Sequence, residues 1–156
     1  MTVRAAMGRR ASAMLAMTVG ACIAVVGSLL PWVRTGSARR NSYDVFALAD
    51  RLGFAPGGAV AEGLRWWPLV PLLAATAVIA AWWGWPRAGG ALGVIAGAYA
   101  GGVGLAVATA DAALVIDVEA GAVVTAAGGV MLVLGSAAAV IIGWRPPRDP
   151  GRRAHL

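Results

Sequence analysis

Four long stretches of apolar residues leave this chain few folds to choose from. They run over about 11–33, 66–85, 89–110 and 121–144, and none has a charged residue in its central part. Each is close to the roughly 20 residues that a helix needs to cross a hydrocarbon core about 30 Å thick. The stretches are too long and too little alternating for the strands of a barrel. The sequence therefore predicts an all-α fold, a four-helix transmembrane bundle.

The composition also favours a chain embedded in lipid over a soluble domain. Of its 156 residues, 60% are hydrophobic and only 13% are charged. A soluble domain needs more polar residues to cover its surface, whereas lipid-facing surface does not. We expect a single transmembrane domain over 1–145. A disordered, basic cytoplasmic tail is expected over 146–156, where closely spaced prolines exclude a helix.

The tryptophans lie at the ends of the apolar stretches. An indole ring suits the membrane–water interface, where the apolar ring meets lipid and the N–H is hydrated. The sequence predicts membrane-interface positions for Trp32, Trp66, Trp67, Trp82, Trp83, Trp85 and Trp144.

The arginines predict the orientation of the chain. Those on the side of the two termini are Arg4, Arg9, Arg10, Arg87, Arg145, Arg148, Arg152 and Arg153, and those in the first loop are Arg34, Arg39, Arg40, Arg51 and Arg65. The larger group belongs on the cytoplasmic side, so we expect a multi-pass protein of the plasma (inner) membrane with both termini cytoplasmic. The net charge of +6 does not point to nucleic acid, because the arginines flank apolar stretches instead of lining one soluble face.

The outer loop, 34–65, contains a predicted short amphipathic helix. Asn41 or Ser42 can cap its start, and Gly53 is a natural stop. We expect this helix to lie on the outer membrane surface or on the bundle. A docking surface and a lid that packs on the helix ends without a partner both remain open. The candidate partner surface comprises Tyr43, Val45, Phe46, Leu48 and Leu52.

Glycines recur at regular spacing in the third and fourth stretches. The first set is spaced by four residues and the second by seven: Gly93, Gly97, Gly101 and Gly121, Gly128, Gly135. Such a glycine zipper lets another helix backbone approach closely. Packing inside the bundle and contact with a second copy or a partner helix are both compatible with the pattern. Either role concerns helix packing and not catalysis.

The side-chain inventory argues against a catalytic site, a metal centre and a bound cofactor. Cys22 is the only cysteine and His155 the only histidine, which removes the usual Cys/His ligand sets and general base. Asp111, Asp117 and Glu119 surround the third connection. They fit a solvated loop, a cation site or pairing with arginines of the first loop. The residues that end at Cys22 resemble a lipobox, but the apolar run continues, which favours a helix cysteine over lipidation.

A string of short motifs resembles a known group of proteins. It consists of Ser28–Val33, Ser42–Asp44, Leu52–Phe54 and Arg65–Pro71. The string resembles a family of uncharacterised small four-helix membrane proteins of actinobacteria and covers roughly the first half of the chain. The Pro-Trp-Val at 31–33 also resembles, over a shorter span, the tryptophan-operon-associated membrane protein family. The first resemblance implies the fold and a plasma-membrane location, and it implies no activity.

The sequence accordingly predicts a non-enzymatic membrane protein. The expected role is an accessory or scaffold subunit that acts through its outer loop and its small-residue helix faces. Its partners would be the lipid bilayer and another membrane protein or a second copy. The alternative is a small oligomeric transporter or channel subunit for neutral solutes, because a pore lined by Gly, Ala and Thr would not favour ions.

Overall fold

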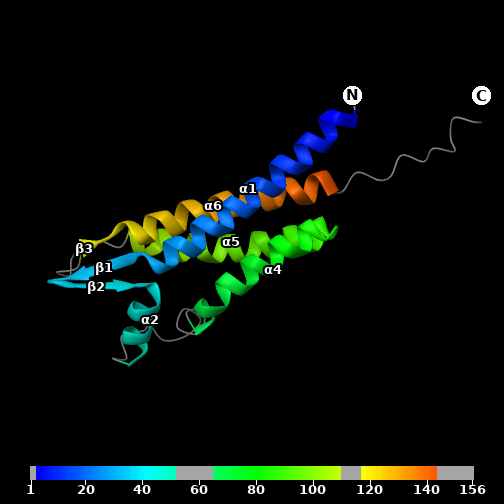
Figure 1. The fold of residues 1–156 in the computed structure, drawn as a ribbon. Helices are drawn as coiled ribbons and strands as arrows, with labels where there is room; N and C mark the ends of the chain where they lie inside the picture. The colour runs from blue at the N-terminus through cyan, green and yellow to red at the C-terminus, as the bar shows by residue number, and fades with distance from the viewer. Residues whose placement is uncertain (1–2, 52–64, 110–116, 144–156) are drawn as a thin grey trace, which may run out of the picture.

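The computed structural model describes residues 3–51, 65–109 and 117–143, and most of these are helical. The helices are α1 (Val3–Leu29), α2 (Ser42–Arg51), the short 3₁₀ helix η1 (Trp67–Leu69), α4 (Val70–Trp82), α5 (Pro86–Ala108) and α6 (Ala120–Gly143). The strands are β1 (Pro31–Thr35), β2 (Ala38–Asn41) and β3 (Asp117–Val118). The longer helices lie side by side, with the strands at one end and the N-terminus and the end of α6 at the other (Figure 1).

Among the described residues, three helices are long and apolar enough to cross a membrane. They span Gly8–Leu29, Pro86–Ala108 and Ala120–Gly143. The second and third of these agree with the predicted stretches 89–110 and 121–144 to within a few residues. The predicted type and approximate limits of these two helices are therefore correct, because a long apolar run is the strongest local signal for such a helix.

The stretch predicted as a helix over 66–85 forms a shorter apolar helix, Trp67–Trp82. Its start is a 3₁₀ turn with Pro68, followed by Pro71 in the first turn of α4, where a missing N–H costs nothing. Gly84 ends it with a φ of +96°, a conformation that glycine adopts without strain. The predicted limits were therefore too wide at this helix.

The chain is mostly helical, as expected, but one end of the molecule also forms a small sheet that the sequence did not predict. α1 stops at Leu29 instead of continuing to residue 33, because Pro31 disfavours a helical residue before it and removes an N–H. β1 then pairs antiparallel with β2 across a tight turn at Gly36, whose φ is +61°. β1 also pairs antiparallel with β3, which precedes α6, so the sheet order is β2-β1-β3.

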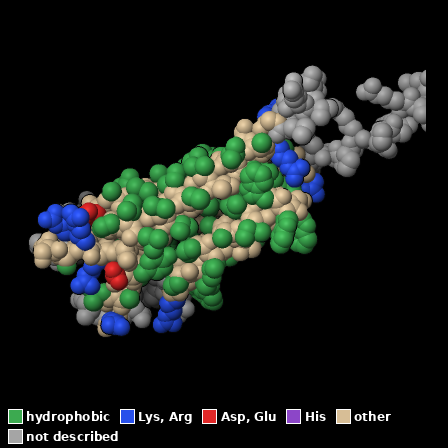
Figure 2. All heavy atoms as spheres, viewed as in Figure 1, with side chains coloured by type: hydrophobic (Ala, Val, Ile, Leu, Met, Phe, Trp, Pro, Cys, Tyr) green, Lys and Arg blue, Asp and Glu red, His purple; other side chains and the backbone are tan. Residues whose placement is uncertain are grey.

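The helices pack through small residues and present large ones outward. α6 packs along both α1 and α5, whereas α4 packs mainly on α5 and less on α1. Buried positions include Ala24, Ala77, Ala81, Ala96, Ala100 and Ala122. Exposed positions include Leu72, Ile95, Leu134 and Ile141, and Figure 2 shows apolar side chains over the visible helix surface. A soluble protein buries its large apolar residues, so this reversed pattern is typical of helices that face lipid.

Candidate functional site

The strand end of the molecule carries a folded structure that we name the cap: β1, β2, β3 and α2. Four aromatic rings from four different elements meet beneath it. Trp32 of β1 and Trp67 of η1 lie 5.3 Å apart between ring centroids, and Phe46 of α2 lies 5.8 Å and 5.3 Å from them. Tyr99 of α5 lies 5.8 Å from Trp67. Most of these contacts are edge-to-face, the arrangement that aromatic quadrupoles favour, so one aromatic core joins the cap to the helices.

Hydrogen bonds from the cap also satisfy the last carbonyls of α1. Trp32 Nε1 donates to the Gly27 carbonyl at 2.9 Å, and the Ser42 hydroxyl donates to the Ser28 carbonyl at 2.6 Å. Ser42 Oγ in turn accepts a bond from Trp67 Nε1 at 2.9 Å. The last four carbonyls of a helix have no partner within it, and leaving them buried without one is costly. The cap therefore completes the end of α1.

Two of the tryptophans predicted at the membrane interface are buried within the protein. Trp32 is 0% and Trp67 1% exposed, so neither ring is accessible at the surface. Their N–H groups bind protein acceptors: the Trp32 N–H donates to a carbonyl at the end of α1, and the Trp67 N–H donates to Ser42 Oγ. The rings of Trp66, Trp82, Trp83 and Trp85 are exposed, and their membrane-interface role stays a prediction. Trp144 lies outside the described residues.

The residues of the predicted partner surface on α2 do not all lie on one exposed face. Asn41 Oδ1 accepts the Asp44 backbone N–H at 3.0 Å and caps the helix, while Ser42 is used in the network described above. Tyr43 and Phe46 pack against the buried aromatic cluster. Val45 and Leu48 are half-buried on an adjacent side of the helix. Leu52 and the predicted stop at Gly53 lie outside the described residues.

The third connection meets the first loop at the cap. The Glu119 backbone N–H donates to the Trp32 carbonyl at 2.8 Å, and Glu119 Oε1 lies 3.5 Å from Arg39 Nε. For Glu119, the structure thus shows one of the three alternatives, pairing with an arginine of the first loop. Asp111 and the side chain of Asp117 lie outside the described residues. Within the described ranges, no group of three or more His, Cys, Asp or Glu residues is placed to hold a metal ion.

We expect this ion pair to add little to stability. The Arg39 side chain is 64% exposed, so water screens the pair, and such pairs contribute about 0–1 kcal/mol. Arg39→Ala should therefore unfold within about 2 °C of the wild type in detergent micelles. Arg34→Ala, at an exposed position on the same hairpin, is the matched control. If Arg39→Ala lowered the unfolding temperature as much as the truncation of a buried side chain does, the cap would depend on this ion pair.

The predicted packing glycines all lie against other segments of the same chain. On α6, a Cβ built at Gly128 would overlap the Ala24 backbone, and a Cβ built at Gly135 would overlap the Met17 backbone. A Cβ built at Gly121 would lie 2.5 Å from the Pro31 carbonyl oxygen. On α5, Gly93 meets Ser136, Gly97 lies 2.8 Å from the Gly129 carbonyl oxygen, and Gly101 lies 3.5 Å from the Gly129 backbone. These distances join the would-be Cβ to the named atoms. In this structure the glycines serve helix contacts within the chain.

The contact between α1 and α6 keeps one antiparallel register along its length. Besides the α6 glycines, Gly20 of α1 lies against the Leu132 backbone and Gly27 of α1 against the Thr125 backbone. Successive contact positions on each helix are three and four residues apart. That alternation averages 3.5 residues per turn, the repeat that keeps two helices in contact over many turns. The seven-residue spacing seen in the sequence arises from this repeat.

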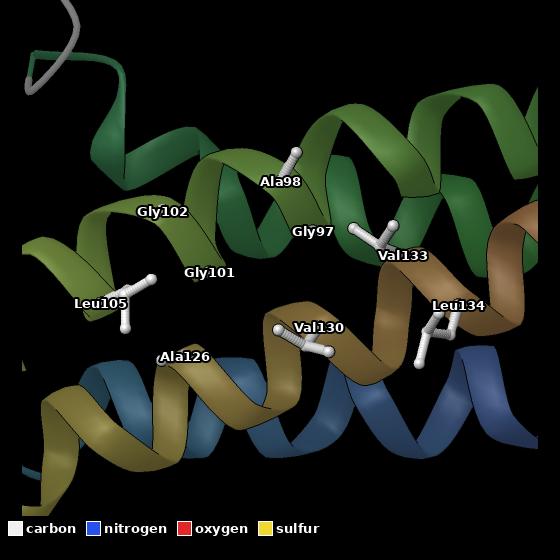
Figure 3. Close-up of a pocket in the computed structure, with 9 residues that line it drawn as sticks. All are labelled: Gly97, Ala98, Gly101, Gly102, Leu105, Ala126, Val130, Val133 and Leu134. Atoms are coloured by element: carbon white, nitrogen blue, oxygen red, sulfur yellow. The ribbon is translucent and has the colours of Figure 1, made fainter.

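Two apolar grooves run along the helices. One, of about 250 Å³, lies between α5 and α6, and Figure 3 shows it lined by Leu105 of α5 and Val130 and Leu134 of α6. The other, of about 430 Å³, lies between α1 and α4 and includes Cys22, which is exposed, and Thr18. The linings offer almost no hydrogen-bonding groups. They suit acyl chains or apolar helices and not polar substrates.

Comparison of the chain with models of known protein families, with curated proteins and with solved structures finds no match. The resemblance to small actinobacterial membrane proteins stays a prediction.

Proposed function

We propose that this chain is a non-enzymatic membrane protein of the plasma membrane that serves as an accessory or scaffold subunit. In this proposal α1, η1 with α4, α5 and α6 form a four-helix transmembrane bundle. The cap lies outside the membrane and both termini lie in the cytoplasm. The observation that most supports it is the buried link between cap and bundle through Trp32 and Trp67, 0% and 1% exposed. A cap fixed in this way presents a partner with a surface that needs no ordering on binding.

The cap offers two half-buried apolar side chains on α2 and several exposed arginines. Val45 and Leu48 of α2 are half-buried, and Arg34, Arg39 and Arg51 are exposed on the same cap. In Figure 2 basic side chains gather around this end of the molecule. Half-buried apolar side chains can be desolvated by a partner, while the exposed arginines favour partners with acidic groups. We therefore propose a membrane protein partner whose outer segment is apolar and acidic.

The predicted alternative, an oligomeric transporter or channel subunit, has less support. Its interface was expected at the glycine stripes, and the six predicted glycines lie against segments of their own chain. A pore would need another contact between copies.

Crosslinking in native membranes tests the proposal. Single cysteines at Ala47 and Ser37, both exposed on the cap, are introduced into a Cys22→Ser background, with Ser12→Cys at the opposite end as control. We expect Ala47→Cys to be labelled by a membrane-impermeant thiol reagent and to crosslink to one specific protein. Adding Val45→Asp and Leu48→Asp should lower that yield by about tenfold, whereas adding Asp44→Asn should not. Crosslinks only between copies would favour the oligomeric alternative, and no crosslink at all would contradict both functions.

A further inference from the structure

The apolar helical segment on one side of the molecule is shorter than the others. η1 and α4 comprise 3 and 13 residues, which at 2.0 and 1.5 Å per residue rise about 25 Å. α5 and α6 comprise 23 and 24 residues and rise about 35 Å each. A typical hydrocarbon layer is about 30 Å thick. The α4 side is too short for that layer, and the α5 and α6 helices are longer than it requires.

Exposed tryptophans mark both ends of the α4 side. Trp66 is 63% exposed before η1, and Trp83 and Trp85 are 83% and 71% exposed after α4. The exposed side chains between these ends are mostly aliphatic, including Leu72 and Ile79, and the hydroxyl-bearing Thr76 is exposed among them. Tryptophan prefers the headgroup level, so the two sets indicate where the hydrocarbon begins and ends on this side.

The cap fixes the polar boundary at the start of α4. α2 lies against η1, because Phe46 contacts the Trp67 ring and Ser42 Oγ accepts the Trp67 N–H. α2 also exposes Asp44 and Arg51. Figure 1 shows that α4 begins beside α2 and short of the sheet end. Ionised side chains are costly within hydrocarbon, so lipid chains beside α4 must end at or before α2.

We propose that the α4 face fits a locally thin bilayer, with a hydrocarbon layer of about 25 Å, as lipids with short acyl chains form. This inference rests on the proposed embedding in a membrane. The longer α5 and α6 helices accommodate the same layer by tilting or by projecting from it, which costs little per ångström. The partner of this surface is thus a class of lipid defined by its chain length.

Reconstitution tests the proposal directly. The full chain is placed in vesicles of phosphatidylcholine with monounsaturated acyl chains of about 14 to 22 carbons, and the midpoint of thermal unfolding is followed by circular dichroism. We expect the highest midpoint with chains of about 14 to 16 carbons, and a fall of about 5 °C with the longest chains. A midpoint that is constant, or that rises with chain length, overturns the proposal.

Two double variants separate the α4 face from general effects of the lipid. Trp83→Leu with Trp85→Leu lengthens the aliphatic surface at exposed positions, and should move the best chain length upward by about two carbons. Trp83→Tyr with Trp85→Tyr keeps the preference for the interface and should leave it unchanged. If the Leu and Tyr double variants were most stable at the same acyl-chain length, the proposal would be contradicted. Failure to insert into any vesicle would overturn the membrane embedding itself, whereas insertion without dependence on thickness would overturn this inference alone.

Discussion

Trp67→Ala is expected to release the cap and to lower the free energy of unfolding by about 3–5 kcal/mol. The ring is 1% exposed and contacts Trp32, Phe46 and Tyr99, so its removal leaves a cavity at the junction of three elements. The variant also leaves the Ser42 hydroxyl without the N–H that it accepts. Denaturant-induced unfolding in detergent micelles, followed by near-UV circular dichroism, measures the loss.

Neighbouring and conservative variants define the cause of this loss. Trp66→Ala removes the same side chain one residue earlier, where it is 63% exposed, and should cost less than about 1 kcal/mol. Trp67→Phe keeps an aromatic ring but removes the N–H. Its loss of unfolding free energy should be about 1–3 kcal/mol, between those of Trp66→Ala and Trp67→Ala. Equal losses for Trp66→Ala and Trp67→Ala would show that the buried cluster does not hold the cap.

Gly128→Leu is expected to prevent stable packing of α1 on α6. A Cβ at this position would already overlap the Ala24 backbone, which cannot move aside as the end of a side chain can. Overpacking usually costs about 1–3 kcal/mol, and more where the obstacle is backbone, so we expect at least about 3 kcal/mol. The measurement is the yield and unfolding midpoint of protein purified in mild detergent.

Gly102→Leu is the matched control for the glycine variant. Gly102 lies in α5, and nothing lies within 4 Å of a Cβ built there. The same change of residue type should therefore leave the unfolding midpoint unchanged or slightly raised, since leucine favours helix over glycine. If Gly128→Leu and Gly102→Leu lowered the unfolding midpoint equally, the α1–α6 contact would not explain the loss. The cause would then be helix propensity or membrane insertion.

Sequence reasoning succeeded where the signal was local. The apolar runs located α5 and α6 because a helix in lipid requires a continuous apolar length. The spacing of Gly128 and Gly135 indicated close helix contact, but spacing is the same for a contact within one chain and between chains. Only the fold shows that Ala24 and Met17 of α1 occupy the other side of that contact.

The sheet of the cap could not be predicted in the same way. β1 and β3 are far apart in the sequence, and β3 has two residues, too few for a recognisable pattern. The irregular register between Pro31 and Val33 further weakens the strand signal. The usable signal was Pro31 directly after an apolar run, which ends a helix. It implies that Trp32 belongs to the next element, where its ring can turn back onto the helix end.

Hydrogen–deuterium exchange of the full chain in lipid nanodiscs tests most directly whether a folded cap is fixed to the helices. The amides that pair in β1 and β2, and the Glu119 amide that donates to the Trp32 carbonyl, should exchange as slowly as those at the adjacent end of α1. Trp67→Ala should speed their exchange at least about tenfold while the middle of α6 stays protected. Rapid exchange of 31–41 in the wild type, with the helices protected, would contradict the account.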